Sequence, residues 1–208
     1  RQMCIRDRPS NFRCEGKLDD LLAEEGITGI TGIDTRALTR LLRKKGTMNG
    51  MITTDVDYCM SDVIMKLHTY KMGNVVRETS CKESYVLKGD GPRIALLDLG
   101  AKANIAASLN KRGCEVTVYP ADTSAETILQ ANPDGIMLSN GPGDPSTCME
   151  IISQVRRLYE SDIPIFAICL GHQLMALANG AKTYKLTYGH RGGCLLYTSD
   201  AADEGLGV

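Results

Sequence analysis

The sequence predicts an α/β protein whose second half folds around a parallel sheet. Short, almost continuously apolar runs alternate there with segments of helical periodicity, the pattern of strand–helix–strand units. Such runs indicate strands that are covered on both faces. A third observation is the stretch Pro164–Gly180, in which an apolar run, a turn at Cys169 and a helical segment follow one another directly. In such a sheet, ligands bind beyond the carboxyl ends of the strands.

The first half of the chain predicts mainly short helices. Residues 17–26 carry leucines at helical spacing and end in a glycine, and residues 61–71 show similar apolar spacing. Residues 27–32 (ITGITG) predict a strand or an extended turn. Residues 34–46 predict an amphipathic helix with Asp34 as N-cap and with cations in the last turn, where the helix dipole favours them. The charge pattern of this segment predicts only that the basic face of the helix is in contact with solvent.

The second half predicts four strands and four helices. Residues 74–90 mix charged residues with Ser and Gly without a sustained period, so we expect them to connect two domains. A regular alternation begins near Pro92. The predicted strands are 93–99, 116–120, 135–139 and 164–169, and the predicted helices are 100–113, 124–131, 149–161 and the segment after Gly171.

The composition excludes several classes of protein. Of 208 residues, 43% are apolar and 24% charged, as in ordinary globular proteins. A net charge of -1 gives no electrostatic footprint for nucleic acid or an anionic membrane. No apolar run approaches the roughly 20 residues of a membrane span, so we expect a cytoplasmic protein. The eight cysteines include no C-x-x-C pair, which argues against a disulfide framework or a zinc site.

Cys169 has the sequence surroundings of a nucleophile on a strained turn. Ala167 and Gly171 flank it, and small residues are needed there because the turn brings backbone close to the nucleophile. The following helix would point its first N–H groups at the thiol, and in such a place a thiol pKa can fall from about 8.5 to roughly 3.5–7.5. The alternative is a cysteine that is only a small buried hydrophobe at a strand end.

The segment NGPGDP at residues 140–145 follows another predicted strand. Its two glycines beside prolines permit a backbone that turns N–H groups outward, which is the geometry needed to hold an oxyanion or a carboxylate. The alternative is a plain turn. No G-x-x-x-x-G-K motif is present, so this loop is not a Walker-type phosphate cradle.

Both segments resemble class I glutamine amidotransferases of the triad type. AICLGHQLMALANGAK is similar to the family's nucleophile segment, with Ala167 where the family usually has Gly, and SNGPGDP is similar to its oxyanion loop. The resemblance implies a flavodoxin-like parallel sheet and a catalytic thiol that forms a thioester with glutamine. It assigns Cys169 as the nucleophile. The L-glutamine contacts that it implies are Gly141, Gly143, Leu170 and Gln173.

A third segment separates this chain from other members of that family. IDTRALTRLLRKKGTMNGMI, beginning at Ile33, resembles the small subunit of carbamoyl-phosphate synthase near the end of its N-terminal domain. The resemblance implies that residues 9–80 are the C-terminal part of that α/β domain. Residues 92–193 are then a C-terminally truncated glutamine amidotransferase domain. Residues 1–8 and 194–208 resemble translated adaptor sequence, and we expect them to be non-native ends.

The resemblance implies a glutaminase subunit that delivers ammonia to a large subunit in a heterodimer. The large subunit would bind ATP and a metal ion and make carbamoyl phosphate for arginine and pyrimidine synthesis, and no cofactor is expected on this chain. One alternative is another class I amidotransferase, of the anthranilate or GMP synthase type. A second is a non-catalytic flavodoxin-like module with an inert cysteine.

The general base of the reaction is not identified among the three histidines. His172 follows Cys169 too closely on the helix, His68 lies in the first half of the chain, and His190 belongs to a loop that resembles a structural or interface motif. The family's triad His and Glu come from an H-x-E segment downstream of the resemblance. We therefore expect this 208-residue chain not to turn over glutamine at a useful rate.

Overall fold

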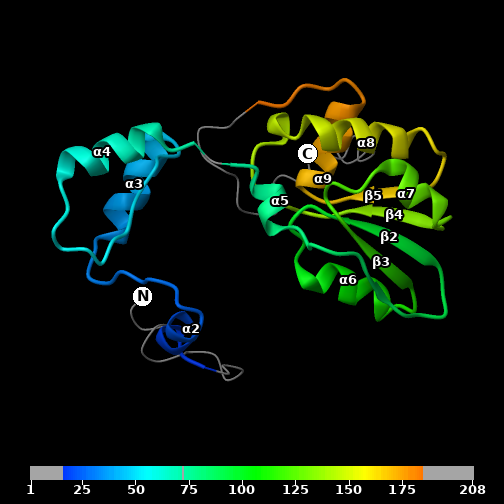
Figure 1. Cartoon of the computed structure of the whole chain (residues 1–208), viewed down its shortest axis with the longest axis horizontal. Coiled ribbons are helices and arrows are strands. Elements are labelled where there is room, and N and C mark those ends of the chain that lie inside the picture. Colours follow the sequence, from blue (N-terminus) through cyan, green and yellow to red (C-terminus); the bar gives the residue numbers. More distant parts are fainter. Residues whose placement is uncertain (1–15, 72, 185–208) are drawn as a thin grey trace, which may run out of the picture. The chain divides into compact units, whose positions relative to one another are not determined.

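The computed structural model describes residues 16–71 and 73–184 of the chain (Figure 1). The chain divides into two compact units, and the second begins at Lys71. We call residues 16–70 the first unit and residues 71–184, without 72, the second unit. The expected domain ranges, 9–80 and 92–193, differ from this division in the assignment of residues 71–91.

The first unit contains helices α2 (Leu18–Glu24), α3 (Thr35–Lys45) and α4 (Met60–Thr69), close to the predicted positions. The predicted N-cap is present, since the Asp34 Oδ1 atom accepts the N–H groups of Arg36 and Ala37 at 3.0 and 2.9 Å. Residues 27–32 form a loop with a bend and no strand, so of the two alternatives predicted there the strand is wrong.

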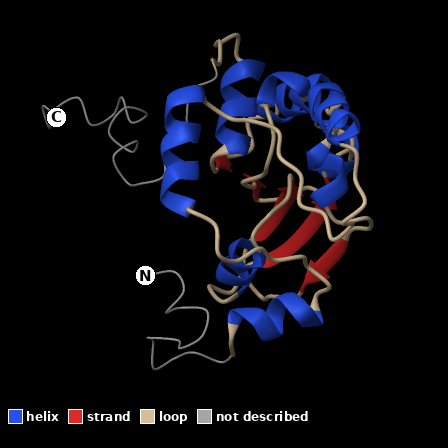
Figure 2. Ribbon diagram, turned by 90° about the vertical axis from the view of Figure 1, so that its left-hand side faces the viewer, coloured by secondary structure: helices blue, strands red, loops and turns tan. Residues whose placement is uncertain are grey.

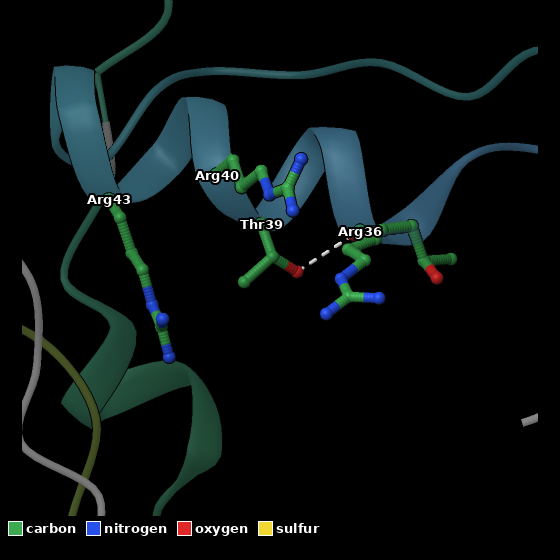
Figure 3. Close-up of a pocket in the computed structure, with 5 residues that line it drawn as sticks. Arg36, Thr39, Arg40 and Arg43 are labelled. Atoms are coloured by element: carbon green, nitrogen blue, oxygen red, sulfur yellow. Dashed lines mark hydrogen bonds between the residues drawn. The ribbon is translucent and has the colours of Figure 1, made fainter. Parts of the chain in front are cut away.

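The helices of the first unit bury none of their own side chains among the described residues. The stripe Leu38, Leu41 and Leu42 of α3 is 36–46% exposed. The predicted basic face of α3 is also present. A shallow pocket on this helix is lined by Thr35, Arg36, Thr39, Arg40 and Arg43, and the three guanidinium groups extend from the helix (Figure 3).

The second unit is built on a five-stranded sheet of order β1-β3-β2-β4-β5. The strands β2 (Arg93–Asp98), β3 (Glu115–Pro120), β4 (Gly135–Leu138) and β5 (Ile165–Ala167) are parallel, as predicted. The segment 74–90 is more than a connection, which corrects our expectation. It holds helix α5 (Val75–Thr79) and strand β1 (Tyr85–Leu87), which pairs antiparallel with β3. Elements of five and three residues are too short to show a period.

Helices lie on both faces of the sheet (Figure 1), and Figure 2 shows the strands, in red, from a second direction. One face packs against α7 (Ala125–Gln130), α8 (Met149–Tyr159) and α9 (Leu170–Ala178), and the other against α6 (Ala103–Asn110). A short helix, η1 (Pro145–Thr147), precedes α8. Alternate residues of β2 face opposite layers, since Leu97 belongs to the α7–α9 core and Leu96 to the α6 core. None of the described helices is long and apolar enough to cross a bilayer.

Coverage of the α6 face is incomplete within the described residues. Beside α6 runs an apolar groove of about 830 Å³, with Met137 of β4 and Phe166 of β5 among its lining residues. The side chain of Phe166 is 67% exposed. The prediction of strands covered on both faces therefore holds for β2 and β3 but fails for β5.

The strand order reverses direction at β2. From β2, the chain moves to β3 on one side, and later returns to β4 on the other side. In open parallel sheets, such a reversal separates the loops at the carboxyl ends of the two strands and leaves room for a ligand. Three segments follow β2, β4 and β5 at this end, and they carry the candidate site.

Candidate active site

The turn between β5 and α9 has the strained geometry predicted for Cys169. This residue has φ 50° and ψ −107°, and its side chain is exposed. A positive φ at a non-glycine residue costs on the order of 1–3 kcal/mol and persists only where the surroundings enforce it. Here the Gly171 N–H donates to the carbonyl of Ser139 at 3.1 Å, and the Gln173 N–H donates to the carbonyl of Cys169 at 3.0 Å. We call residues 168–171 the elbow.

The need for a small residue after Cys169 is confirmed by the packing of Gly171. A Cβ added there would lie 2.7 Å from both the Cβ and the carbonyl oxygen of Leu138, and 2.8 Å from the carbonyl oxygen of Ser139. Any side chain would therefore push the start of α9 away from β4. The turn also forms with Ala167 in place of the family's usual glycine.

The loop after β4, residues 139–144, packs directly against the elbow, and we call it the β4 loop. A Cβ on Gly141 would lie 2.1 Å from the carbonyl oxygen of Leu99 and 2.7 Å from Cδ2 of Leu170. The structure thus brings Gly141 and Leu170, two of the expected glutamine contacts, side by side. Gly143 has φ 98° with open space around its Cβ position, and Gln173 is exposed.

Two backbone donors of this region remain available. Among residues 16–71 and 73–184, the N–H groups of Gly141 and Leu170 have no hydrogen-bond acceptor. Leu170 is the first residue of α9, where an N–H group has no partner within the helix. Leu170 directly follows the strained, exposed Cys169, and its side chain lies against Gly141. Unpaired backbone N–H groups are able to stabilise an oxyanion where they point at the carbonyl oxygen under attack.

Sequence reasoning missed the residues that hold these loops together. Asp98, at the end of β2, is 8% exposed, and its carboxylate accepts the N–H groups of Cys81, Gly100 and Ala101 at 2.7–2.9 Å. Ser139, which follows β4, is fully buried. The signal in the sequence was a polar residue at the end of an apolar run. Such a residue lies at the carboxyl end of a parallel strand, which is where ligands bind.

The cysteines differ in their electrostatic surroundings. Burial and then the carboxylate of Asp98 raise the pKa of the Cys81 thiol, and burial raises the pKa of Cys148. The exposed Cys59 of the first unit behaves differently, because hydrogen bonding to the Ser61 hydroxyl, whose oxygen lies 2.9 Å from the Cys59 sulfur, lowers its pKa. Among the cysteines that the structure describes, we therefore expect Cys59 to compete most with Cys169 for an electrophile.

The structure offers no histidine partner for the thiol among the residues that it describes. His172, in the first turn of α9, and His68, near the end of α4, are both exposed, and neither has a hydrogen bond to Cys169. His190 lies outside the described residues. Within that same part of the chain, no cluster of His, Cys, Asp and Glu could hold a metal ion.

Two family models match the chain. The model described as "Glutamine amidotransferase class-I" matches residues 95–205, and that of the "Carbamoyl-phosphate synthase small chain, CPSase domain" matches residues 2–52. These matches run through most of residues 1–8 and 194–208, whose non-native origin stays a prediction.

Similar proteins are named carbamoyl phosphate synthase small chain. That of Listeria monocytogenes serotype 4b (strain F2365) is 48% identical over 185 residues, which are 88% of this chain and 50% of the relative. That of Clostridium perfringens (strain 13 / Type A) is 46% identical over 184 residues, 88% of this chain and 52% of the relative. The chain spans about half the length of these relatives. A solved structure described as a putative GMP synthase protein from Thermoplasma acidophilum covers 44% of this chain and 46% of its own, with 24% identity and a TM-score of 0.39.

Proposed function

The chain belongs to the class-I glutamine amidotransferase family, and from that premise we propose that its second unit carries the nucleophile and the oxyanion donors of a glutaminase site. The observation that carries the proposal is the strained, exposed Cys169, which directly precedes the free N–H group of Leu170, while the Leu170 side chain lies against Gly141, whose N–H group is also free. A cysteine kept only for packing would be buried and would need no strained backbone.

The proposed reaction is acyl transfer through a thioester. The Cys169 thiolate attacks the side-chain amide carbon of L-glutamine, and the Gly141 and Leu170 N–H groups stabilise the oxyanion that forms. Collapse of this intermediate breaks the carbon–nitrogen bond, and the nitrogen leaves as ammonia after it takes up a proton. Water then hydrolyses the thioester to glutamate. The expected substrate contacts Gly143 and Gln173 belong to the β4 loop and to the first turn of α9, the two segments that also supply these donors.

The names of the similar proteins indicate which enzyme the glutaminase site serves. Because they are named carbamoyl phosphate synthase small chain, and because residues 2–52 match the small-chain domain, we assign the glutaminase role to carbamoyl-phosphate synthase rather than to an anthranilate or GMP synthase. The ammonia then passes to a large subunit that binds ATP and a metal ion and makes carbamoyl phosphate. In this proposal the two subunits form a heterodimer in the cytoplasm, and the carbamoyl phosphate serves arginine and pyrimidine synthesis.

The general base is assigned to neither His68 nor His172. His172 is three residues after the nucleophile and is exposed on α9, and neither histidine has a hydrogen bond to Cys169. Formation of the first covalent bond at Cys169 is therefore a better test of the site than turnover. A glutamine analogue with an electrophilic ketone in place of the side-chain amide needs the thiol and the oxyanion donors only.

The test measures which cysteine such an analogue labels. We expect Cys169 to react first and L-glutamine to protect it, because among the described cysteines this thiol alone combines an exposed side chain and a strained backbone with the free N–H groups of Leu170 and Gly141. Labelled peptides are identified by mass spectrometry. A Cys59→Ser variant removes the competing low-pKa thiol and is the control for non-specific alkylation. If Cys169 reacts no faster than Cys59 and glutamine gives no protection, the second unit is a non-catalytic module.

A further inference from the structure

Ser139 is a buried residue whose bonds reach every loop of the candidate site. Its hydroxyl oxygen accepts the N–H of Leu99 at 2.9 Å, and its hydroxyl donates to the carbonyl of Asn140 at 2.8 Å. Its own carbonyl accepts the N–H of Gly171 at 3.1 Å. The residue is 0% exposed. One side chain and its backbone thus join the end of β2, the β4 loop and the elbow.

The bond from Ser139 to Asn140 fixes the orientation of a functional peptide group. The carbonyl of Asn140 and the N–H of Gly141 belong to the same peptide bond, and the described chain contains no cis peptide. In a trans peptide, the C=O and N–H bonds point in opposite directions. When the carbonyl is held on the Ser139 hydroxyl, the Gly141 N–H must therefore point away from Ser139, and this is one of the two oxyanion donors proposed above.

Neighbouring contacts hold the Asn140–Gly141 segment in place, but they do not fix the direction in which its peptide C=O and N–H bonds point. The Asn140 side chain accepts the N–H of Lys102 at 3.1 Å, which holds the residue beside the start of α6. Gly141 lies so close to the carbonyl of Leu99 that a Cβ would be 2.1 Å away. Neither contact involves the Asn140 carbonyl or the Gly141 N–H. Among the described residues, the Ser139 hydroxyl is the side-chain donor on this carbonyl.

We infer that Ser139 is a positioning residue of the glutamine site, which aims the Gly141 N–H at the oxyanion by holding the carbonyl of Asn140. The inference rests on the proposed function, since it assumes that an oxyanion forms at Cys169. Ser139 itself touches neither substrate nor thiol in this assignment. Its loss should change the direction of one donor and leave the nucleophile in place.

The experiment compares Ser139→Ala with Ser80→Ala in the 208-residue chain. Ser80 is a matched control because it is also buried, at 6% exposure, and its hydroxyl oxygen accepts the Ala121 N–H at 2.9 Å. Each variant leaves one buried N–H without its acceptor, so both should lose similar stability. Only Ser139→Ala releases the Asn140 carbonyl.

Two measurements are made on each variant. The first is the residual dipolar coupling of the Gly141 N–H, which reports the direction of that bond by NMR. The second is the labelling rate of Cys169 by the electrophilic glutamine analogue, divided by its rate with iodoacetamide, whose displacement reaction develops no oxyanion. In Ser139→Ala, we expect a changed coupling and a ratio reduced roughly 10- to 100-fold, since removal of a whole oxyanion donor costs about 10²–10³. Ser80→Ala should change neither.

The outcomes separate this inference from the proposed function. An unchanged Gly141 coupling in Ser139→Ala, or a changed coupling with the same labelling ratio as in Ser80→Ala, would overturn the positioning role. A wild-type chain whose Cys169 shows no preference for the glutamine analogue would instead overturn the proposed function, and the inference with it. In that case the coupling would still report whether Ser139 orients the peptide.

Discussion

Replacement of Gly171 by alanine should separate the elbow from the sheet. The added Cβ would lie 2.7 Å from the Cβ and the carbonyl oxygen of Leu138, whereas ordinary contacts begin near 3.4 Å, so α9 must move by 0.7 Å (3.4 − 2.7). The same movement would stretch the 3.1 Å bond from the Gly171 N–H to Ser139 to about 3.8 Å, beyond hydrogen-bonding range. Overpacking costs about 1–3 kcal/mol, and a lost hydrogen bond costs about 0.5–1.5 kcal/mol.

We therefore expect Gly171→Ala to lower the free energy of unfolding of the second unit by roughly 1.5–4.5 kcal/mol. Urea denaturation followed by circular dichroism measures this loss. Gly180→Ala, just after α9, is the control. Gly180 has φ 86° but nothing within 4 Å of its Cβ position, so only backbone strain of about 1–2 kcal/mol is expected there. A loss in Gly171→Ala no larger than in Gly180→Ala would show that α9 is not held against β4 as described.

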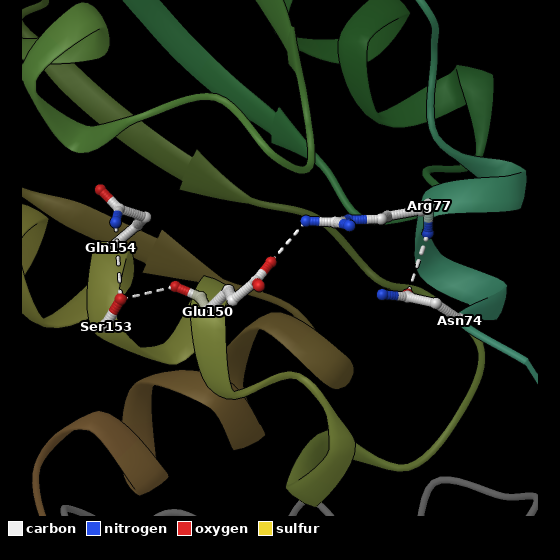
Figure 4. A network of polar contacts seen from close by, with 5 residues as sticks. All are labelled: Asn74, Arg77, Glu150, Ser153 and Gln154. Carbon is white, nitrogen blue, oxygen red and sulfur yellow. Dashed lines mark hydrogen bonds and ion pairs between the residues drawn. The ribbon is translucent and has the colours of Figure 1, made fainter.

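Three further predictions concern charges and thiols. Asp98→Asn should lower the pKa of Cys81, because a carboxylate that disfavours the thiolate is removed, and the pH profile of Cys81 alkylation should move to lower pH. Ser61→Ala should raise the pKa of Cys59 toward its ordinary value, so that maleimide labelling of this thiol at pH 7 slows. Glu150→Ala removes the exposed ion pair between α8 and α5 (Figure 4) and should change the urea midpoint little, since such pairs contribute about 0–1 kcal/mol.

The sequence alone predicted those parts of the fold whose strands and helices are long and have a clear pattern of apolar residues. The strands from β2 to β5 and their helices lie where the apolar runs and helical spacing predict them. Helix α3 begins at its predicted cap, Asp34. The strained turn at Cys169 also follows from local features, namely small flanking residues between an apolar run and a helix.

Features that depend on contacts distant in sequence could not be predicted in this way. Strand β1 has three residues and exists because it pairs with β3, about thirty positions further along the chain. The role of Ser139 depends on the proximity of Leu99, 40 residues earlier, and of Gly171 in the first turn of α9. A serine that ends an apolar run marks the carboxyl end of a strand, but it does not reveal which distant residues it contacts there.

The segment that leads into the second unit is a structural part of that unit rather than a tether. Val76 is 2% exposed in the core of the α7–α9 face, the Ser80 hydroxyl accepts the N–H of Ala121, and the Cys81 N–H is held by Asp98. For protein engineering, an isolated second unit should therefore start at or before Lys71, because a start at Pro92 would remove a buried side chain, a sheet strand and a support of the β2 end.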